Sequence, residues 1–205
     1  MPRRLSALAP ALALAAACAG VQAASVSVFV GDPAGRPLHD AVVMLEPATG
    51  KLPVAPLAGV QIAQVKRQFA PQVSVVTVGT PVTFPNDDTV RHHVYSFSPV
   101  KTFELKLYAG VPNAPVMFDK PGIAVLGCNI HDQMVAWVVV VDTPFYARSA
   151  ASGKARIEGV PSGNYQLRIW HSSLPEGAPP TSSALAVGGA DVEQRAALNI
   201  VGPGR

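Results

Sequence analysis

The sequence is short of cysteine, of charge and of long apolar segments, and each shortage excludes a class of protein. Of its 205 residues only 2 are cysteine, Cys18 and Cys128, and 14% are charged. No cluster of lysine and arginine occurs, so the electrostatic footprint that nucleic-acid binding needs is missing. After the N-terminal segment, no stretch is long and apolar enough to cross a bilayer as a helix. We therefore expect neither a nucleic-acid partner nor a membrane span.

Catalytic signatures are also scarce. The sequence holds no glycine-rich phosphate loop, no nucleophile elbow and no Cys-x-x-Cys-His motif for haem attachment. Asp87 and Asp88 form a pair of carboxylates, but between Asn86 and Thr89 they indicate a polar turn rather than an acid–base pair. We expect a protein that is not an enzyme.

Residues 1–24 have the composition of a secretory signal peptide. Arg3 and Arg4 precede an apolar run rich in alanine and leucine, and the segment ends in small residues. The run is too short and wrongly flanked for a membrane-spanning helix. We expect cleavage after Ala23 or Ala24 and a periplasmic protein. The alternative is a lipoprotein attached through Cys18, because the residues before it loosely resemble a lipobox.

Removal of this segment changes the charge and cysteine balance. Arg3 and Arg4 leave with it, so the 16 basic residues fall to 14 against 13 acidic ones, a net charge of +1. Cys18 leaves as well, and Cys128 then has no disulfide partner in an oxidising compartment. A lone thiol there is open to oxidation unless a bound metal holds it.

Turn residues dominate the rest of the sequence. It contains 20 proline and 17 glycine residues, and segments with a helical period are few. Short valine-rich runs take their place. Residues 25–30, for example, alternate between apolar and polar side chains and are followed by a turn at residues 31–37. The pattern predicts an all-β protein.

The densest cluster of metal-binding residue types is the segment Cys128-Asn129-Ile130-His131-Asp132-Gln133-Met134. Its cysteine, histidine and methionine recur at every third position. Residues three apart on a strand point to opposite faces of a sheet. The segment must therefore be a loop if its three side chains are to converge. Taken singly, Cys128 and Met134 could also be buried core residues.

Sulfur and imidazole ligands without a required carboxylate favour copper. Two histidines and one cysteine in a plane, with a weak axial methionine, form the geometry of electron-transfer copper sites. Zinc is the main rival, but a thioether is a poor fourth ligand for zinc. The second histidine can come from Arg91-His92-His93-Val94 on a neighbouring strand. Adjacent residues of a strand face opposite ways, so His92 or His93 can bind, but not both.

Residues 57–142 resemble the cupredoxins of the amicyanin and plastocyanin type. Residues 76–86 match their Val-x-x-Gly-x-x-Val-x-Phe-x-Asn pattern, and residues 118–128 match the segment that ends at the ligand cysteine. In this alignment His92 takes the place of the first ligand, with His93 at the position of an asparagine. Residues 92–97 and 128–132 also resemble cupredoxin-type proteins labelled as methylamine-utilisation proteins.

The resemblance implies a Greek-key β-sandwich that binds one type 1 copper ion per chain. Its ligands would be His92, Cys128, His131 and Met134, with His93 as the alternative to His92. It further implies transfer of single electrons to or from a redox partner protein, such as a dehydrogenase or a cytochrome, by a monomer. A flat apolar patch formed by Val111, Pro112, Pro115 and Ile130 would dock that partner, although ordinary loop packing is the alternative for each of these residues. Asp132 is a candidate to tune the basicity of His131.

The flanking segments resemble a second family, the carboxypeptidase regulatory-like or transthyretin-like β-sandwich. Residues 25–47 match its first half, and residues 152–170 match its second half. We therefore expect a smaller immunoglobulin-like or transthyretin-like sandwich made of residues 25–56 and 143–205, into which residues 57–142 are inserted. The alternative is a cupredoxin with an N-terminal extension and a separate C-terminal module.

Two other functions remain open at the level of sequence. The first is storage of copper or its delivery to another periplasmic protein. The second is a carbohydrate- or protein-binding β-module whose cupredoxin part has lost its metal, although the four ligand types are all present.

Overall fold

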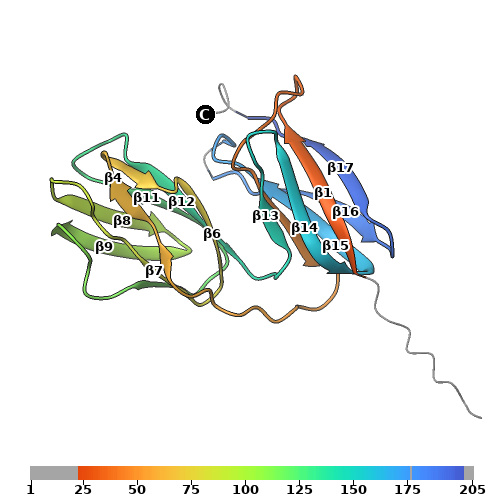
Figure 1. Ribbon diagram of the computed structural model, residues 1–205, viewed down its shortest axis with the longest axis horizontal. Coiled ribbons are helices and arrows are strands. Elements are labelled where there is room, and N and C mark those ends of the chain that lie inside the picture. The colour runs from red at the N-terminus through yellow and green to blue at the C-terminus, as the bar shows by residue number, and fades with distance from the viewer. Residues whose placement is uncertain (1–22, 176, 201–205) are drawn as a thin grey trace, which may run out of the picture.

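The computed structural model describes residues 23–175 and 177–200, and each regular element in these ranges is a β-strand (Figure 1). The prediction of an all-β protein is confirmed. None of these residues forms a helix long and apolar enough to span a membrane. The predicted signal peptide lies outside the described residues except for Ala23 and Ala24, which begin the first strand.

One half of the molecule consists of two sheets, drawn on the right of Figure 1. The first sheet has the order β14-β1-β17 and contains β1 (Ala23–Gly31), β14 (Lys154–Pro161) and β17 (Val192–Ala197). The second has the order β13-β2-β15-β16 and contains β2 (Val42–Pro47), β13 (Tyr146–Arg148), β15 (Gly163–Trp170) and β16 (Thr181–Val187). Apolar residues of both sheets share one core, so the two sheets pack face to face.

The other half also has a large and a small sheet. The five-stranded sheet has the order β6-β12-β11-β8-β9 and contains β6 (Val73–Thr77), β8 (His92–Ser98), β9 (Lys101–Tyr108), β11 (Gly122–Gly127) and β12 (Val135–Val141). The smaller sheet, β10-β7-β3, contains β3 (Val60–Gln61), β7 (Thr80–Thr83) and β10 (Val116–Phe118). A hairpin of β4 (Ala63–Val65) and β5 (Gln68–Ala70) completes this half.

The chain leaves the first half after β2 and returns to it at β13. β1 pairs with β14, and β2 pairs with β15, although residues 60–141 separate these partners in the sequence. Each half has its own hydrophobic core of buried residues. The predicted domain limits at residues 56/57 and 142/143 remain a proposal.

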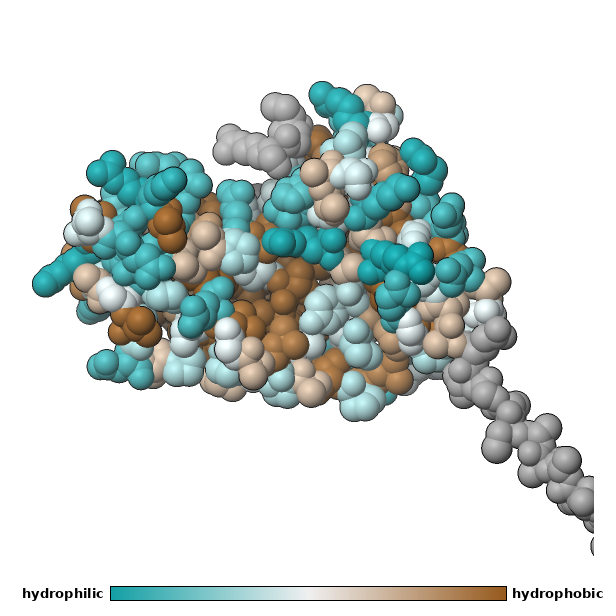
Figure 2. Space-filling model, in the orientation of Figure 1, coloured by the Kyte–Doolittle hydropathy of each residue, from teal (hydrophilic) through white to brown (hydrophobic). Residues whose placement is uncertain are grey.

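A third apolar cluster joins the two halves. Its buried members come from both sides and comprise Val42, Met44, Val73, Val139, Val141 and Trp170. The rings of Trp137 and Trp170 lie 6.3 Å apart. Arg148 reaches across and donates a hydrogen bond of 2.7 Å to the carbonyl oxygen of Val73. Figure 2 shows hydrophobic residues gathered at the centre of the view, where the halves meet.

The turn that follows β1 is built around one buried carboxylate. Asp32 Oδ1 accepts hydrogen bonds from the backbone amides of Ala34 and Arg36, and its Oδ2 lies 2.6 Å from Nε of Arg36. Burial acts to raise the pKa of Asp32, but the donors of Arg36 and Ala34 outweigh it and hold this pKa below the usual value of 3.8.

Replacement of Asp32 by alanine should therefore destabilise the protein in a pH-dependent way. A carboxyl group with a lowered pKa contributes stability above its unfolded-state pKa and loses it as pH falls through the folded-state pKa. The difference in unfolding free energy between wild type and Asp32→Ala should be largest near neutral pH and shrink below pH ~4. Urea unfolding at several pH values measures it. Glu193→Gln, at an exposed position of β17, is the control.

Candidate metal centre

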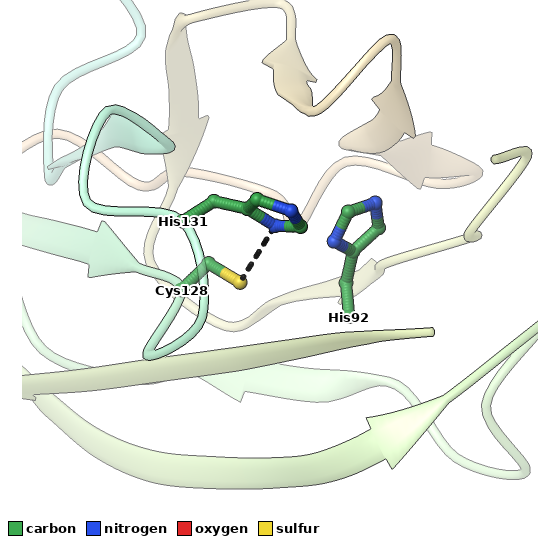
Figure 3. A group of neighbouring side chains, drawn as sticks. All are labelled: His92, Cys128 and His131. Carbon is green, nitrogen blue, oxygen red and sulfur yellow. Dashed lines mark hydrogen bonds between the residues drawn. The ribbon is translucent and has the colours of Figure 1, made fainter. Parts of the chain in front are cut away.

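Three of the four predicted ligands come together at one end of the second half. Each of His92, Cys128 and His131 offers one ligand atom, and these atoms all lie within 4.8 Å of one another. Cys128 Sγ is 3.9 Å from Nδ1 of His131, and the two histidine rings are 5.0 Å apart (Figure 3).

The loop of residues 128–134 has the geometry that its spacing requires. Cys128 directly follows β11, and Met134 directly precedes β12. Two turns lie between them, the second closed by a 2.9 Å hydrogen bond from the Met134 amide to the His131 carbonyl oxygen. β11 and β12 pair antiparallel up to Gly127 and Val135, so the base of the loop is fixed by the sheet.

Strand pairing brings the first histidine to the same place. His92 begins β8, which lies between β11 and β9 in the sheet. The pairing of Tyr95 with Gly127 places β8 beside the end of β11. The register of β8 against β9 shifts between His92 and Val94, an irregularity of the kind that re-aims side chains beside functional sites.

Met134 is 1% exposed and belongs to the same buried cluster as Cys128. It therefore lies in the core where the loop meets β12, at the position for which the sequence predicts the axial ligand. A core role and a ligand role are both compatible with this burial.

The polar atoms of the site fit a metal ion. His92 is fully buried, and its Nε2 lies 2.8 Å from Oδ2 of Asp88. Its Nδ1 is buried without a hydrogen-bond partner among the described residues. Leaving a buried polar atom unpaired costs about 1–3 kcal/mol. In Figure 3 one ring nitrogen of His92 points toward His131 and Cys128, which is where a metal would pair it.

His93 faces a different environment. Its Nε2 lies 3.0 Å from Oε1 of Glu104 on β9 without hydrogen-bond alignment, and its ring packs edge-on against Tyr95. His93 is not part of the group formed by His92, Cys128 and His131.

Two polar residues that support this end of the fold were not among the predicted site residues. Asn86 Nδ2 donates to the carbonyl oxygens of Val90 and Tyr108, and its Oδ1 accepts from the Asp88 amide. Asp88 contacts His92 directly. Burial acts to raise the pKa of Asp88, but hydrogen bonds from the Arg67 amide, from His92 and from the Lys66 amide lower it overall. The sequence signal was an acid four residues before a histidine, which is also typical of a turn.

Tyr108 lies beside the same site and stays neutral. Burial raises its pKa to about 12, against the hydrogen bond with Gln64, which acts to lower this pKa, and with a smaller increase from the charge of Cys128. Its hydroxyl donates to the carbonyl oxygen of Phe84 and accepts from Nε2 of Gln64. At physiological pH it is a phenol engaged in these bonds and does not compete as a phenolate ligand.

The four residues of the predicted docking patch are all at least partly exposed. Val111 is 69% exposed and Ile130 48% exposed, Pro115 is exposed and Pro112 is half-buried. His131 is half-buried, whereas His92 and Cys128 are buried, so the site approaches solvent on the His131 side.

Comparisons with known proteins find matches among solved structures that cover part of the chain. No protein-family model matches, and a search of curated proteins finds no match. Among solved structures, a purple cupredoxin from Nitrosopumilus maritimus shares 23% identity over 40% of this chain and 99% of its own, with a TM-score of 0.36. The reduced Cu(I) form, at pH 4, of a single-residue mutant of amicyanin shares 20% identity over 48% and 98%, with a TM-score of 0.38.

A copper-containing nitrite reductase from Thermus scotoductus SA-01 shares 25% identity over 56% of this chain and 28% of its own, with a TM-score of 0.38. These identities and TM-scores are low. The assignment of a metal therefore rests on the side chains of this chain.

Exchange of each histidine in turn tests which one faces the metal. His92→Gln should weaken Cu(II) binding by more than the roughly 10–100-fold that loss of a ligand's hydrogen-bond partner costs, because it removes a predicted ligand itself. His93→Gln should leave the affinity unchanged, since His93 faces Glu104. Competition titration with a chelator measures both. The reverse pattern would move the site to His93.

Proposed function

We propose that His92, Cys128, His131 and Met134 bind one copper ion per chain as a type 1 centre, and that the protein passes single electrons between redox partners. The observation that carries the proposal is the convergence of two imidazoles and a free buried thiol, with one buried imidazole nitrogen unpaired and directed into the group.

The donor set selects the metal. Thiolate, imidazole and thioether ligands suit copper, and bound copper supplies one-electron redox chemistry. Zinc is less well matched, because structural zinc sites use four nitrogen, sulfur or carboxylate donors. Cys128 is the single free cysteine among the described residues, and its burial limits oxidation by solvent species.

The fold holds the donors in fixed places. β8 supplies His92, while β11 and β12 fix both ends of the loop that carries the other three residues. A donor set held in this way presents almost one geometry to both oxidation states, so little rearrangement opposes outer-sphere transfer. Four protein donors also leave no open position for a substrate, which catalytic metal sites keep. We therefore infer a carrier rather than an enzyme.

Electrons would enter and leave on the His131 side. The half-buried His131 is directly preceded by the exposed apolar residue Ile130, which we predict to form a docking patch with Val111, Pro112 and Pro115. A partner that covers this patch approaches the site more closely there than over the buried His92. The partner would be a dehydrogenase or a cytochrome.

The remaining parts of the interpretation are proposals of the same kind. Residues 1–24 would direct the chain to the periplasm and be removed. Residues 57–142 would form a copper domain inserted into a carboxypeptidase regulatory-like sandwich of residues 25–56 and 143–205. The protein would act as a monomer, and it would be of the cupredoxin type labelled as methylamine-utilisation proteins.

Visible absorption and electron paramagnetic resonance spectra after addition of one equivalent of Cu(II) test the function. An intense blue or green thiolate-to-copper band with one copper per chain supports a type 1 centre, and fast electron self-exchange then supports a carrier. A colourless protein, or one that binds zinc in preference, contradicts the proposal. Rapid exchange of Cu(I) with a chelator, without electron self-exchange, would instead indicate storage or delivery.

Cys128→Ser should abolish the thiolate-to-copper band, because serine offers no thiolate at that position. The far-ultraviolet circular dichroism spectrum should keep its β form, since the two side chains have similar volumes. A variant that retains the visible band would contradict the role of Cys128.

Met134→Gln should lower the reduction potential while the visible band persists. An amide oxygen is a harder donor than a thioether and stabilises Cu(II), and the axial ligand tunes the potential of such sites. Protein-film voltammetry of wild type and variant measures the shift. An identical potential in both proteins would show that Met134 is a core residue and not an axial ligand.

A further inference from the structure

The carboxylate of Asp88 has polar partners beyond its own turn. Its Oδ1 accepts a hydrogen bond of 2.6 Å from the backbone amide of Lys66, and its Oδ2 accepts one of 2.8 Å from that of Arg67. The same Oδ2 lies 2.8 Å from Nε2 of His92. Asp88 therefore links a distant hairpin to the metal centre.

The two backbone amides that bind Asp88 belong to residues whose backbone conformation is unfavourable for L-amino acids. Lys66 and Arg67 form the turn between β4 and β5, whose last pair is Val65 with Gln68. Both turn residues have positive φ, 53° and 57°. Two-residue hairpins of this kind usually carry asparagine or glycine at such positions. Here two larger residues adopt this conformation, and the backbone amides of both donate to the carboxylate of Asp88.

The donor and acceptor roles follow from these contacts. A backbone amide can only donate, so both oxygens of Asp88 act as acceptors toward the hairpin. The ring nitrogen facing Oδ2 is then the one that carries a proton. In a neutral imidazole the other nitrogen, Nδ1, must hold a lone pair. That atom is buried, has no partner among the described residues and belongs to the ring beside His131.

We propose that Asp88 is a positioning residue of the metal centre: its carboxylate fixes His92 as the tautomer protonated on Nε2 and directs the Nδ1 lone pair toward Cys128 and His131. The hairpin turn at Lys66 and Arg67 holds the carboxylate in place. The tautomer is a property of the metal-free protein. The effect on copper rests in addition on the proposed function.

The tautomer of His92 in the metal-free wild-type protein is the direct test. Long-range ¹H–¹⁵N correlation spectra distinguish a protonated ring nitrogen from one with a lone pair. The proposal expects the proton of His92 on Nε2. A proton on Nδ1 would overturn it, and this measurement needs neither a variant nor a metal.

Asp88→Ala tests whether the carboxylate is the cause. Without the acceptor, the His92 signals should show a mixture of tautomers or a shift to the other one, while the signals of His93 stay unchanged because it faces Glu104. An unchanged single tautomer of His92 would overturn the proposal. Asp87→Ala removes the neighbouring exposed carboxylate and should change nothing.

A double variant separates Asp88 from the side chains of the hairpin. Lys66→Gly with Arg67→Gly keeps both backbone amides and suits positive φ, so the His92 tautomer should be retained. A change of tautomer in this variant would assign the effect to the cationic side chains. It would contradict the proposal that the backbone amides hold the carboxylate in place.

Copper affinity gives the second readout. Loss of an outer-shell partner typically lowers metal affinity about 10–100-fold, and Asp88→Ala should fall in that range relative to Asp87→Ala. If wild type shows the expected tautomer but binds no copper, the proposed function fails and the positioning role stands. If copper binds and Asp88→Ala has wild-type affinity, the role of Asp88 at the metal is wrong.

Discussion

The candidate metal centre depends on the pairing of β8 with β11 at Tyr95 and Gly127. A Cβ atom at position 127 would lie 2.7 Å from Cζ and 2.8 Å from the hydroxyl oxygen of Tyr95, so a side chain there would force the tyrosine away. Glycine allows the two strands to come together with Tyr95 lying across the sheet. The ends of these strands then place His92 and Cys128 side by side, and the loop to β12 adds the remaining residues.

β12 serves both halves of the molecule. Val138 and Val140 belong to the core that contains Cys128 and Met134, whereas Val139 and Val141 belong to the cluster shared with Trp170. A strand buried on both faces cannot alternate between apolar and polar residues, and this explains the uninterrupted apolar run that follows Met134. The same strand therefore anchors the loop of the candidate metal centre and joins the halves.

The all-β class and the loop could be predicted because they depend on local patterns. Frequent turn residues with short valine runs indicated strands, and the spacing of Cys128, His131 and Met134 required a loop, as the structure has it. The choice between His92 and His93 could not be made from the residues alone. It depends on the local register of β8 against β9 and on the contact of His93 with Glu104.

Asp88 was read as part of a polar turn for a related reason. Its position in a loop agrees with that reading, but its partners Lys66 and Arg67 lie more than twenty residues away in the sequence. Local composition describes which residues make a turn. It does not describe which distant amides meet a given carboxylate, because that depends on how the hairpin of β4 and β5 packs in the tertiary structure.

The shared strand has a thermodynamic consequence. A ligand that binds only the folded loop raises the free energy of unfolding of whatever unfolds together with that loop. Since β12 contributes to the core beneath the loop and to the cluster with Trp170, separating the halves would expose Val139 and Val141 on the strand that the loop enters. Binding of a metal at the candidate centre should therefore make the two halves unfold more cooperatively on heating. It should not stabilise only the half that carries the predicted ligands.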